Sequence, residues 1–152
     1  MCECEALFTK FLWTNLTSID PNDLPKSSGV YAIRTRKRGS KVKEVIEKVY
    51  DYLKRTEWHP FMDFVNNRLE RVTTISDCPI IYIGAAPTGL MARYNDLCGQ
   101  RHTVFFPILA LLLSEWQLDY GYVEAIEAKR EEAQLKTQYR RVHGALPALV
   151  KR

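Results

Sequence analysis

Three short segments rich in β-branched and aromatic residues most constrain the fold of this chain. They are GVYAIRT (29–35), PIIYIG (79–84) and QLDYGYVEA (117–125). Valine, isoleucine and tyrosine favour extended backbone, and a short apolar run that stops at a glycine is typical of a buried strand. The sequence therefore predicts three strands in one small sheet, mixed or antiparallel.

Segments with helical spacing of apolar residues separate these strands. In VKEVIEKVYDYLKRT, for example, apolar residues recur every three or four positions, as on one face of an amphipathic helix. The segment LFTKFLWTNL (7–16) indicates only a turn or a short helix. The order of elements predicts one α/β (α+β) domain over residues 1–152, with a helical insertion at about 39–74 between the first two strands. The predicted helices cover 42–56, 61–72, 90–99, 105–116 and 125–143.

The net charge and the hydropathy of the chain limit the possible classes of binding partner only slightly. A net charge of +4 favours an anionic partner weakly. The longest apolar run, VFFPILALLL (104–113), has ten residues, whereas a membrane span needs about twenty. It therefore predicts a buried helix and no membrane partner. The first ten residues, MCECEALFTK, lack the apolar core of a signal peptide, so we expect a cytoplasmic location.

The four cysteines are expected to be free thiols, as is usual in a reducing compartment. Cys2 and Cys4 form a CxC pair, which differs from the CxxC pairs of structural zinc sites. No second pair with matching spacing follows. A metal site of Cys2, Cys4 and a distant histidine remains an alternative, while His59 and His143 are expected at the surface near helix ends.

A second pattern combines tyrosine, arginine and glutamate. Tyr31 and Tyr82 each lie in a predicted strand, close to a glycine. Arg93 lies in the helix after the second strand, and Glu132 in the last helix. A carboxylate binds Mg²⁺ through oxygen, arginine neutralises a phosphate, and a tyrosine hydroxyl orients or deprotonates water. The combination suits hydrolysis of a phosphate ester.

These residues give the chain a resemblance to the GIY-YIG nuclease superfamily. The tripeptide GVY, preceded by LPKSS, resembles its first signature, and YIG resembles its second. Arg93 stands eleven residues after Tyr82, one more than is usual in the family. Glu132 fits the family pattern A-x-x-x-E-x-x-L, whereas Glu131 does not and should point elsewhere. In this interpretation Gly84 lets the chain turn close to the site.

The resemblance implies an endonuclease that depends on Mg²⁺ or Mn²⁺ and hydrolyses phosphodiester bonds of DNA. In that family the late glutamate holds the metal, so Glu132 is the expected metal ligand. Tyr31 would position or deprotonate the attacking water, with help from Tyr82 or His102. Arg93 would stabilise the charge on the phosphoryl oxygens.

A basic stretch, RTRKRGSKVK (34–43), contains no acidic residue and is the best indication of nucleic acid outside the motifs. Such a patch would follow the phosphate backbone without reading sequence; the alternative is a solvated loop. Sequence-specific recognition would require the insertion, a homodimer or a partner subunit. The expected DNA-binding residues are Arg34, Arg36, Lys37, Arg38, Lys41 and Arg101.

Two departures from the family pattern leave other functions open. The chain has fifty residues between Tyr31 and Tyr82, where the family usually has a short hairpin. Leu149 or Val150 stands where many members carry an asparagine. One alternative is a catalytically impaired nucleic-acid-binding module of the same fold. The other is a protein–protein adaptor that uses the helical insertion.

Overall fold

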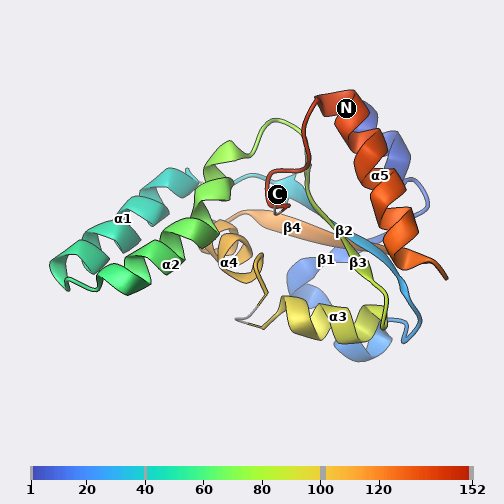
Figure 1. Cartoon of the computed structure of the whole chain (residues 1–152), viewed down its shortest axis with the longest axis horizontal. Coiled ribbons are helices and arrows are strands. Elements are labelled where there is room, and N and C mark those ends of the chain that lie inside the picture. The colour runs from blue at the N-terminus through green and yellow to red at the C-terminus, as the bar shows by residue number, and fades with distance from the viewer. Residues whose placement is uncertain (1, 40, 100–101, 151–152) are drawn as a thin grey trace.

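A four-stranded antiparallel sheet lies at the centre of the computed structural model, which describes residues 2–39, 41–99 and 102–150. The strand order is β1-β4-β2-β3, so the long strand β2 lies in the interior of the sheet and β3 at one edge (Figure 1). The strands are β1 (Leu12–Asn15), β2 (Gly29–Lys37), β3 (Ile80–Ala86) and β4 (Gln117–Glu124).

The sheet has four strands, and the prediction of three was wrong. The additional strand, β1, lies in the segment expected to form a turn or short helix, and it pairs with β4. It has only four residues, too few to show a clear alternation of apolar and polar side chains. A β-carbon on Gly121 of β4 would lie 2.5 Å from the Trp13 ring, so this glycine makes room for the indole of β1. The strand therefore depends on a distant partner.

The predicted helices are present, with ends that differ by a few residues. The last helix begins at Ala128 rather than at 125, and the second continues as a short 3-10 helix. Three more short 3-10 helices, η1 (Glu3–Phe8), η2 (Leu16–Ser18) and η3 (Pro21–Asp23), lie in the N-terminal segment. The remaining helices are α1 (Val42–Arg55), α2 (His59–Leu69), η4 (Glu70–Thr74), α3 (Leu90–Leu97), α4 (Phe105–Leu113) and α5 (Ala128–His143).

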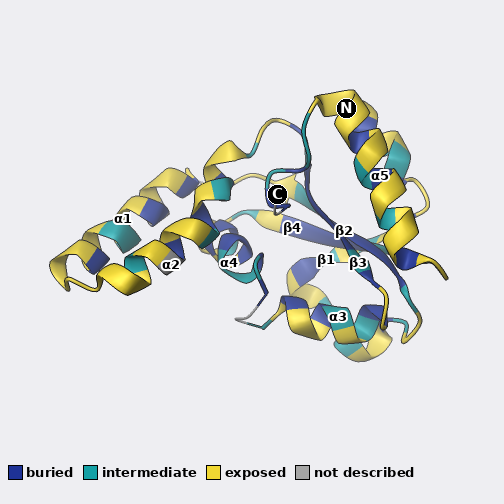
Figure 2. Ribbon diagram, viewed as in Figure 1, coloured by how far each residue is buried: buried dark blue, intermediate teal, exposed yellow. Residues whose placement is uncertain are grey.

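Helices cover both faces of the sheet, because alternate side chains of β2 point to opposite sides. Tyr31 and Ile33 belong to a core shared with α3 and α4, while Val30 and Ala32 belong to a second core shared with α5 and η1. In Figure 1, α3 and α5 accordingly lie on opposite sides of the strands. Figure 2 shows the strands largely buried between them.

Helices α1 and α2 occupy the segment between β2 and β3, where the helical insertion was expected. They form an antiparallel pair that extends away from the sheet (Figure 1). Ile46, Leu53 and Val65 are buried within the pair or against the main core. No helix in the described part of the chain is long and apolar enough to span a membrane, and the apolar helix α4 has nine residues.

Candidate functional site

Three tyrosines from neighbouring strands lie side by side on the α3 face of the sheet. They are Tyr31 of β2, Tyr82 of β3 and Tyr120 of β4. Tyr31 pairs with Gly84 of β3 and with Tyr122 of β4, and Tyr82 and Tyr120 each stand two residues before these partners, so their side chains point to the same face as Tyr31. The Tyr31 ring lies 5.8 Å from the Tyr82 ring and 5.7 Å from the Tyr120 ring, measured between centroids. The two signature tyrosines are therefore neighbours, although fifty residues separate them in the sequence.

Gly84 has a different role from the one expected. It lies inside β3, not at a turn. A β-carbon on Gly84 would lie 2.6 Å from both Cζ and Oη of Tyr31, well inside van der Waals contact. The Tyr31 ring therefore lies directly over the backbone of Gly84, and the absence of a side chain there allows the tyrosine to occupy this position.

The loop that precedes β2 positions Arg93. Helix α3 begins after Gly89, and its first amides donate to this loop: Leu90 N–H to the Ser27 carbonyl at 2.9 Å and Met91 N–H to the Pro25 carbonyl at 3.0 Å. These carbonyls satisfy amides that have no partner within the helix. Segment LPKSS therefore attaches α3 beside the start of β2, and Arg93 in the first turns of α3 reaches the tyrosines.

The pKa values of Tyr31 and Tyr82 are affected by their burial, by each other and by Arg93. Burial raises the pKa of Tyr31, the neighbouring Tyr82 raises it further, and the Arg93 guanidinium opposes both effects. Burial also raises the pKa of Tyr82, and here Arg93 lowers it while the Glu132 carboxylate raises it. Both hydroxyls are therefore protonated at neutral pH, and they act as hydrogen-bond donors rather than as bases.

His102 lies in the loop between α3 and α4 and is buried beside Tyr82, with the ring centroids 6.1 Å apart in an edge-to-face arrangement. Its Nδ1 accepts a hydrogen bond from the Val104 amide at 3.1 Å. Burial lowers the pKa of His102 to about 4, and the positive charges of Arg93 and Arg68 contribute. The ring is therefore neutral at pH 7, and because Nδ1 accepts, its proton is on Nε2.

Three buried donor atoms in this region make no hydrogen bond of normal length and angle with the described residues: Tyr31 Oη, Arg93 Nε and His102 Nε2. The Tyr31 hydroxyl is nevertheless close enough to Tyr82 and Arg93 for both to shift its pKa. The three atoms come from β2, α3 and the loop before α4. A fourth such atom, Tyr120 Oη, belongs to the ring stacked on Tyr31. Buried polar atoms are almost always paired in folded proteins, so a group of unpaired donors indicates a place where an acceptor-rich ligand binds.

Glu132 is set apart from this group. It lies on α5, which packs on the other face of the sheet, and its Oε1 accepts a hydrogen bond from Lys136 Nζ at 3.0 Å. Both side chains are about a quarter exposed, at 23% and 24%. Glu132 influences the pKa of Tyr82, but in the described part of the chain it makes no hydrogen bond with Tyr31 or Arg93. Glu131, the neighbour that does not fit the family pattern, is exposed.

The basic stretch has structural partners that the sequence did not indicate. Arg34 Nε donates to Asp119 Oδ2 at 3.1 Å, and Arg36 Nε donates to Asp119 Oδ1 at 2.9 Å. The Arg34 guanidinium also lies over the Trp13 ring, 4.1 Å from its centroid, on the face opposite the tyrosines. Buried Asp119 thus neutralises part of the charge that was expected to meet DNA.

The other expected DNA contacts differ in their surroundings. Arg38 donates to the Ser76 carbonyl and lies 5.2 Å from the Trp116 ring centroid. Lys37 and Lys41 are exposed. The expected contact at residue 101 lies outside the described residues.

Two arginines that the sequence analysis missed lie nearer to the candidate site. Arg68 and Arg71, at the end of the helical insertion, line a cleft of about 460 Å³ together with Thr103 and Leu149. Arg68 lies close enough to His102 to lower its pKa. In the sequence these arginines are part of an amphipathic helix and the turn after it, so no local signal distinguished them from a solvated surface.

The C-terminal segment returns to the edge of the sheet. The Leu149 amide donates to the Ile81 carbonyl of β3 at 2.9 Å, and both Leu149 and Val150 are buried in the core that contains Tyr82. The position where the sequence resemblance would place an asparagine is therefore occupied by apolar side chains. It contributes packing and no hydrogen bond from a side chain.

No family model, no curated protein and no solved structure matches this chain.

Proposed function

We propose that this chain is a metal-dependent endonuclease that hydrolyses phosphodiester bonds of DNA in the manner of GIY-YIG nucleases. The observation that carries the proposal is the group of three buried donors without acceptors, Tyr31 Oη, Arg93 Nε and His102 Nε2. A phosphodiester offers acceptor oxygens and a negative charge, which suit the Arg93 guanidinium and neutral N–H and O–H donors. The same three residues belong to the pattern that resembles the GIY-YIG nucleases.

Each residue has a role that follows from its protonation state. Arg93 stabilises negative charge on the phosphoryl oxygens, because its guanidinium is always protonated. His102 donates Nε2–H to a phosphate oxygen and does not accept a proton, since Nδ1 is already occupied by the Val104 amide. Tyr31 and Tyr82 orient the attacking water through neutral hydroxyls.

The carboxylate of Glu132 is the residue that would hold a divalent cation. Mg²⁺ commonly binds one or two carboxylates and completes its shell with water and substrate phosphate, so a single glutamate is enough protein for this ion. In the described part of the chain Glu132 is not hydrogen-bonded to the three donors, but it lies close enough to Tyr82 to raise the pKa of that hydroxyl. Lys136 donates to one oxygen of Glu132, so a metal at this carboxylate would compete with the lysine for that oxygen. A cation there would neutralise charge on the phosphodiester and on its leaving oxygen.

The test is a cleavage assay on plasmid and branched DNA, with Mg²⁺ and with EDTA. Arg93→Ala and Glu132→Gln should reduce cleavage by at least about a hundredfold, because each removes a charge that acts at the transition state. Glu131→Gln is the matched control. Because Glu131 is exposed, this variant should cut DNA as well as the unmodified protein does. Absence of Mg²⁺-dependent cleavage, or equal cleavage by all variants, would contradict the proposal.

A second candidate is a nucleic-acid-binding module of the same fold without catalysis. The Glu132–Lys136 ion pair favours it, because an amine already provides the positive charge that a metal would bring. The apolar Leu149 and Val150 at the asparagine position favour it as well. In this case Arg93→Ala weakens DNA binding, Glu132→Gln leaves binding unchanged, and none of the proteins cuts.

A further inference from the structure

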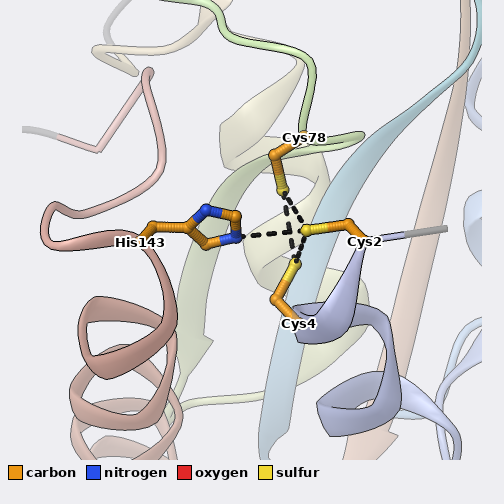
Figure 3. Close-up of side chains that lie close together, drawn as sticks. All are labelled: Cys2, Cys4, Cys78 and His143. Carbon is orange, nitrogen blue, oxygen red and sulfur yellow. Dashed lines mark hydrogen bonds between the residues drawn. The ribbon is translucent and has the colours of Figure 1, made fainter.

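Three cysteines and one histidine meet in the part of the fold that belongs to the second core, apart from the core that holds Tyr31 and Tyr82. Cys2 and Cys4 come from η1 and the residue before it, Cys78 from the loop before β3, and His143 is the last residue of α5. Figure 3 shows the four side chains pointing toward one another. Their three Sγ atoms and one imidazole nitrogen all lie within 4.8 Å of one another.

The distances match the edges of a metal coordination shell. Sγ of Cys4 lies 3.2 Å from Sγ of Cys2 and 3.3 Å from Sγ of Cys78, and the third sulfur pair is 3.6 Å apart. Nε2 of His143 lies 3.3 Å from Sγ of Cys2. In a tetrahedron with Zn–S bonds of about 2.3 Å and a Zn–N bond of about 2.0 Å, the ligand atoms lie about 3.5–3.8 Å apart. The three sulfurs need to move apart only slightly to reach this geometry, and no pair of the four ligand atoms is more than 4.8 Å apart.

No pair of these sulfurs forms a disulfide. A disulfide bond is about 2.05 Å long, and the shortest sulfur–sulfur distance in the cluster is 3.2 Å. Three thiols gathered around one point, with a histidine as the fourth member, also leave one thiol unpaired whichever two are joined. A shared cation uses all four groups, whereas a disulfide uses two.

Tyr139 supports the cluster in the way that residues around metal sites do. Its hydroxyl donates to Cys78 Sγ at 3.4 Å, and its ring lies 4.4 Å from the His143 ring, between centroids. Groups that hydrogen-bond to metal ligands and fix their orientation are typical of the surroundings of zinc. Tyr139 is one turn before His143 on α5, so the helix itself places the tyrosine between cysteine and histidine.

We propose that Cys2, Cys4, Cys78 and His143 form a structural zinc site. Three sulfurs and one imidazole nitrogen are ligands that Zn²⁺ prefers, and hard cations such as Mg²⁺ do not. Four protein ligands fill a tetrahedral shell and leave no position for substrate, which identifies the role as structural. This site is separate from the carboxylate of Glu132 and does not depend on the proposed nuclease activity.

The zinc would hold together three segments that are far apart in the sequence. It would fix the N-terminal η1 and the end of α5 to the loop that leads into β3. Cys78 is four residues before Tyr82, and Glu132 lies on the helix that ends at His143. The ion would therefore also set the position of α5 relative to the strand that carries Tyr82.

The first experiment measures metal in the whole protein, purified without chelators from cells grown in zinc-supplemented medium. We expect one zinc per chain by elemental analysis. Removal of zinc and addition of Co²⁺ should give the thiolate charge-transfer bands and the intense visible bands of tetrahedral Co²⁺. Less than about 0.2 zinc per chain together with no tetrahedral Co²⁺ spectrum would overturn the proposal.

Variants then assign the ligands. Cys4→Ser and Cys78→Ser should each lower the zinc content several-fold, and Cys98→Ser is the matched control because this exposed cysteine is outside the cluster. His143→Ala removes an exposed side chain, so the chain should still fold, bind zinc more weakly and shift the visible bands of Co²⁺. Equal zinc in all variants would mean an adventitious ion only and would overturn the assignment.

Discussion

Replacing Gly84 by alanine tests the packing on which the candidate site depends. The new β-carbon would lie 2.6 Å from Cζ and Oη of Tyr31, whereas carbon contacts are normally about 3.5–4.0 Å. The ring must therefore move by about 1 Å. It is 1% exposed and lies between the rings of Tyr82 and Tyr120, so it has no space into which to move.

The expected cost follows from two opposing effects. Forcing an extra carbon into a packed core costs about 1–3 kcal/mol. Glycine within a strand is about 0.5–1 kcal/mol less favourable than alanine, and the substitution regains that amount. We therefore expect Gly84→Ala to lower the free energy of unfolding by up to about 2.5 kcal/mol, which lowers the Tm by up to about 10 °C in a chain of this size.

Chemical unfolding of a double-mutant cycle provides the measurement. In a Tyr31→Leu background the ring atoms that meet the new β-carbon are absent, so Gly84→Ala should be nearly neutral or stabilising there. The coupling free energy should be about 1 kcal/mol or more. Gly121→Ala is a useful comparison: its β-carbon meets Trp13, which is partly exposed and can move, so the cost should be smaller. An equal cost of Gly84→Ala in both backgrounds would refute the reasoning.

Three further predictions concern charge. Because its pKa of about 4 in the folded protein is below the ordinary value of about 6.5, His102 should destabilise the fold by up to about 3 kcal/mol as pH falls from 6.5 to 4. Unfolding of His102→Asn should lack this part of the pH dependence, and an unchanged profile would contradict the assignment. Lys136→Ala frees the Glu132 carboxylate, so half-maximal cleavage should need a lower Mg²⁺ concentration than in the unmodified protein. An unchanged Mg²⁺ concentration at half-maximal cleavage would show that Lys136 does not compete with the metal for Glu132. In DNA binding at low salt, Arg71→Ala should weaken affinity more than Arg34→Ala, because Arg71 lines the cleft next to Thr103 and Leu149, whereas Arg34 is paired with Asp119 on the face opposite the tyrosines; the opposite order would place the DNA on that face.

The three strands that the sequence predicted correctly are those whose own residues favour extended backbone. β2, β3 and β4 contain enough β-branched and aromatic residues to favour extended backbone wherever they pair. The short strand β1 has no such pattern, because its four residues become a strand only when β4 offers hydrogen bonds to them. To predict β1 from the sequence, one would have to know in advance that it pairs with β4.

In the candidate site, too, some features could be predicted from the sequence and others could not. Spacing along the chain was enough to select Tyr31, Tyr82 and Arg93, and the structure brings them together with His102. Spacing could not show that Lys136 binds Glu132, although the two are one turn apart, because a charged helix offers several such pairs. It also could not show that Asp119 binds Arg34 and thereby removes it from the expected DNA surface.

The sequence by itself determined the helices and three of the four strands, since these follow from local propensity and periodicity. Only the tertiary structure decided which side chains share a point in space. Gly84 lies under Tyr31 because β2 and β3 pair in one register. Cys78 and His143 reach Cys2 because α5 and η1 cover the same face of the sheet. Contacts between distant segments are set by packing and register, which no single stretch of sequence contains.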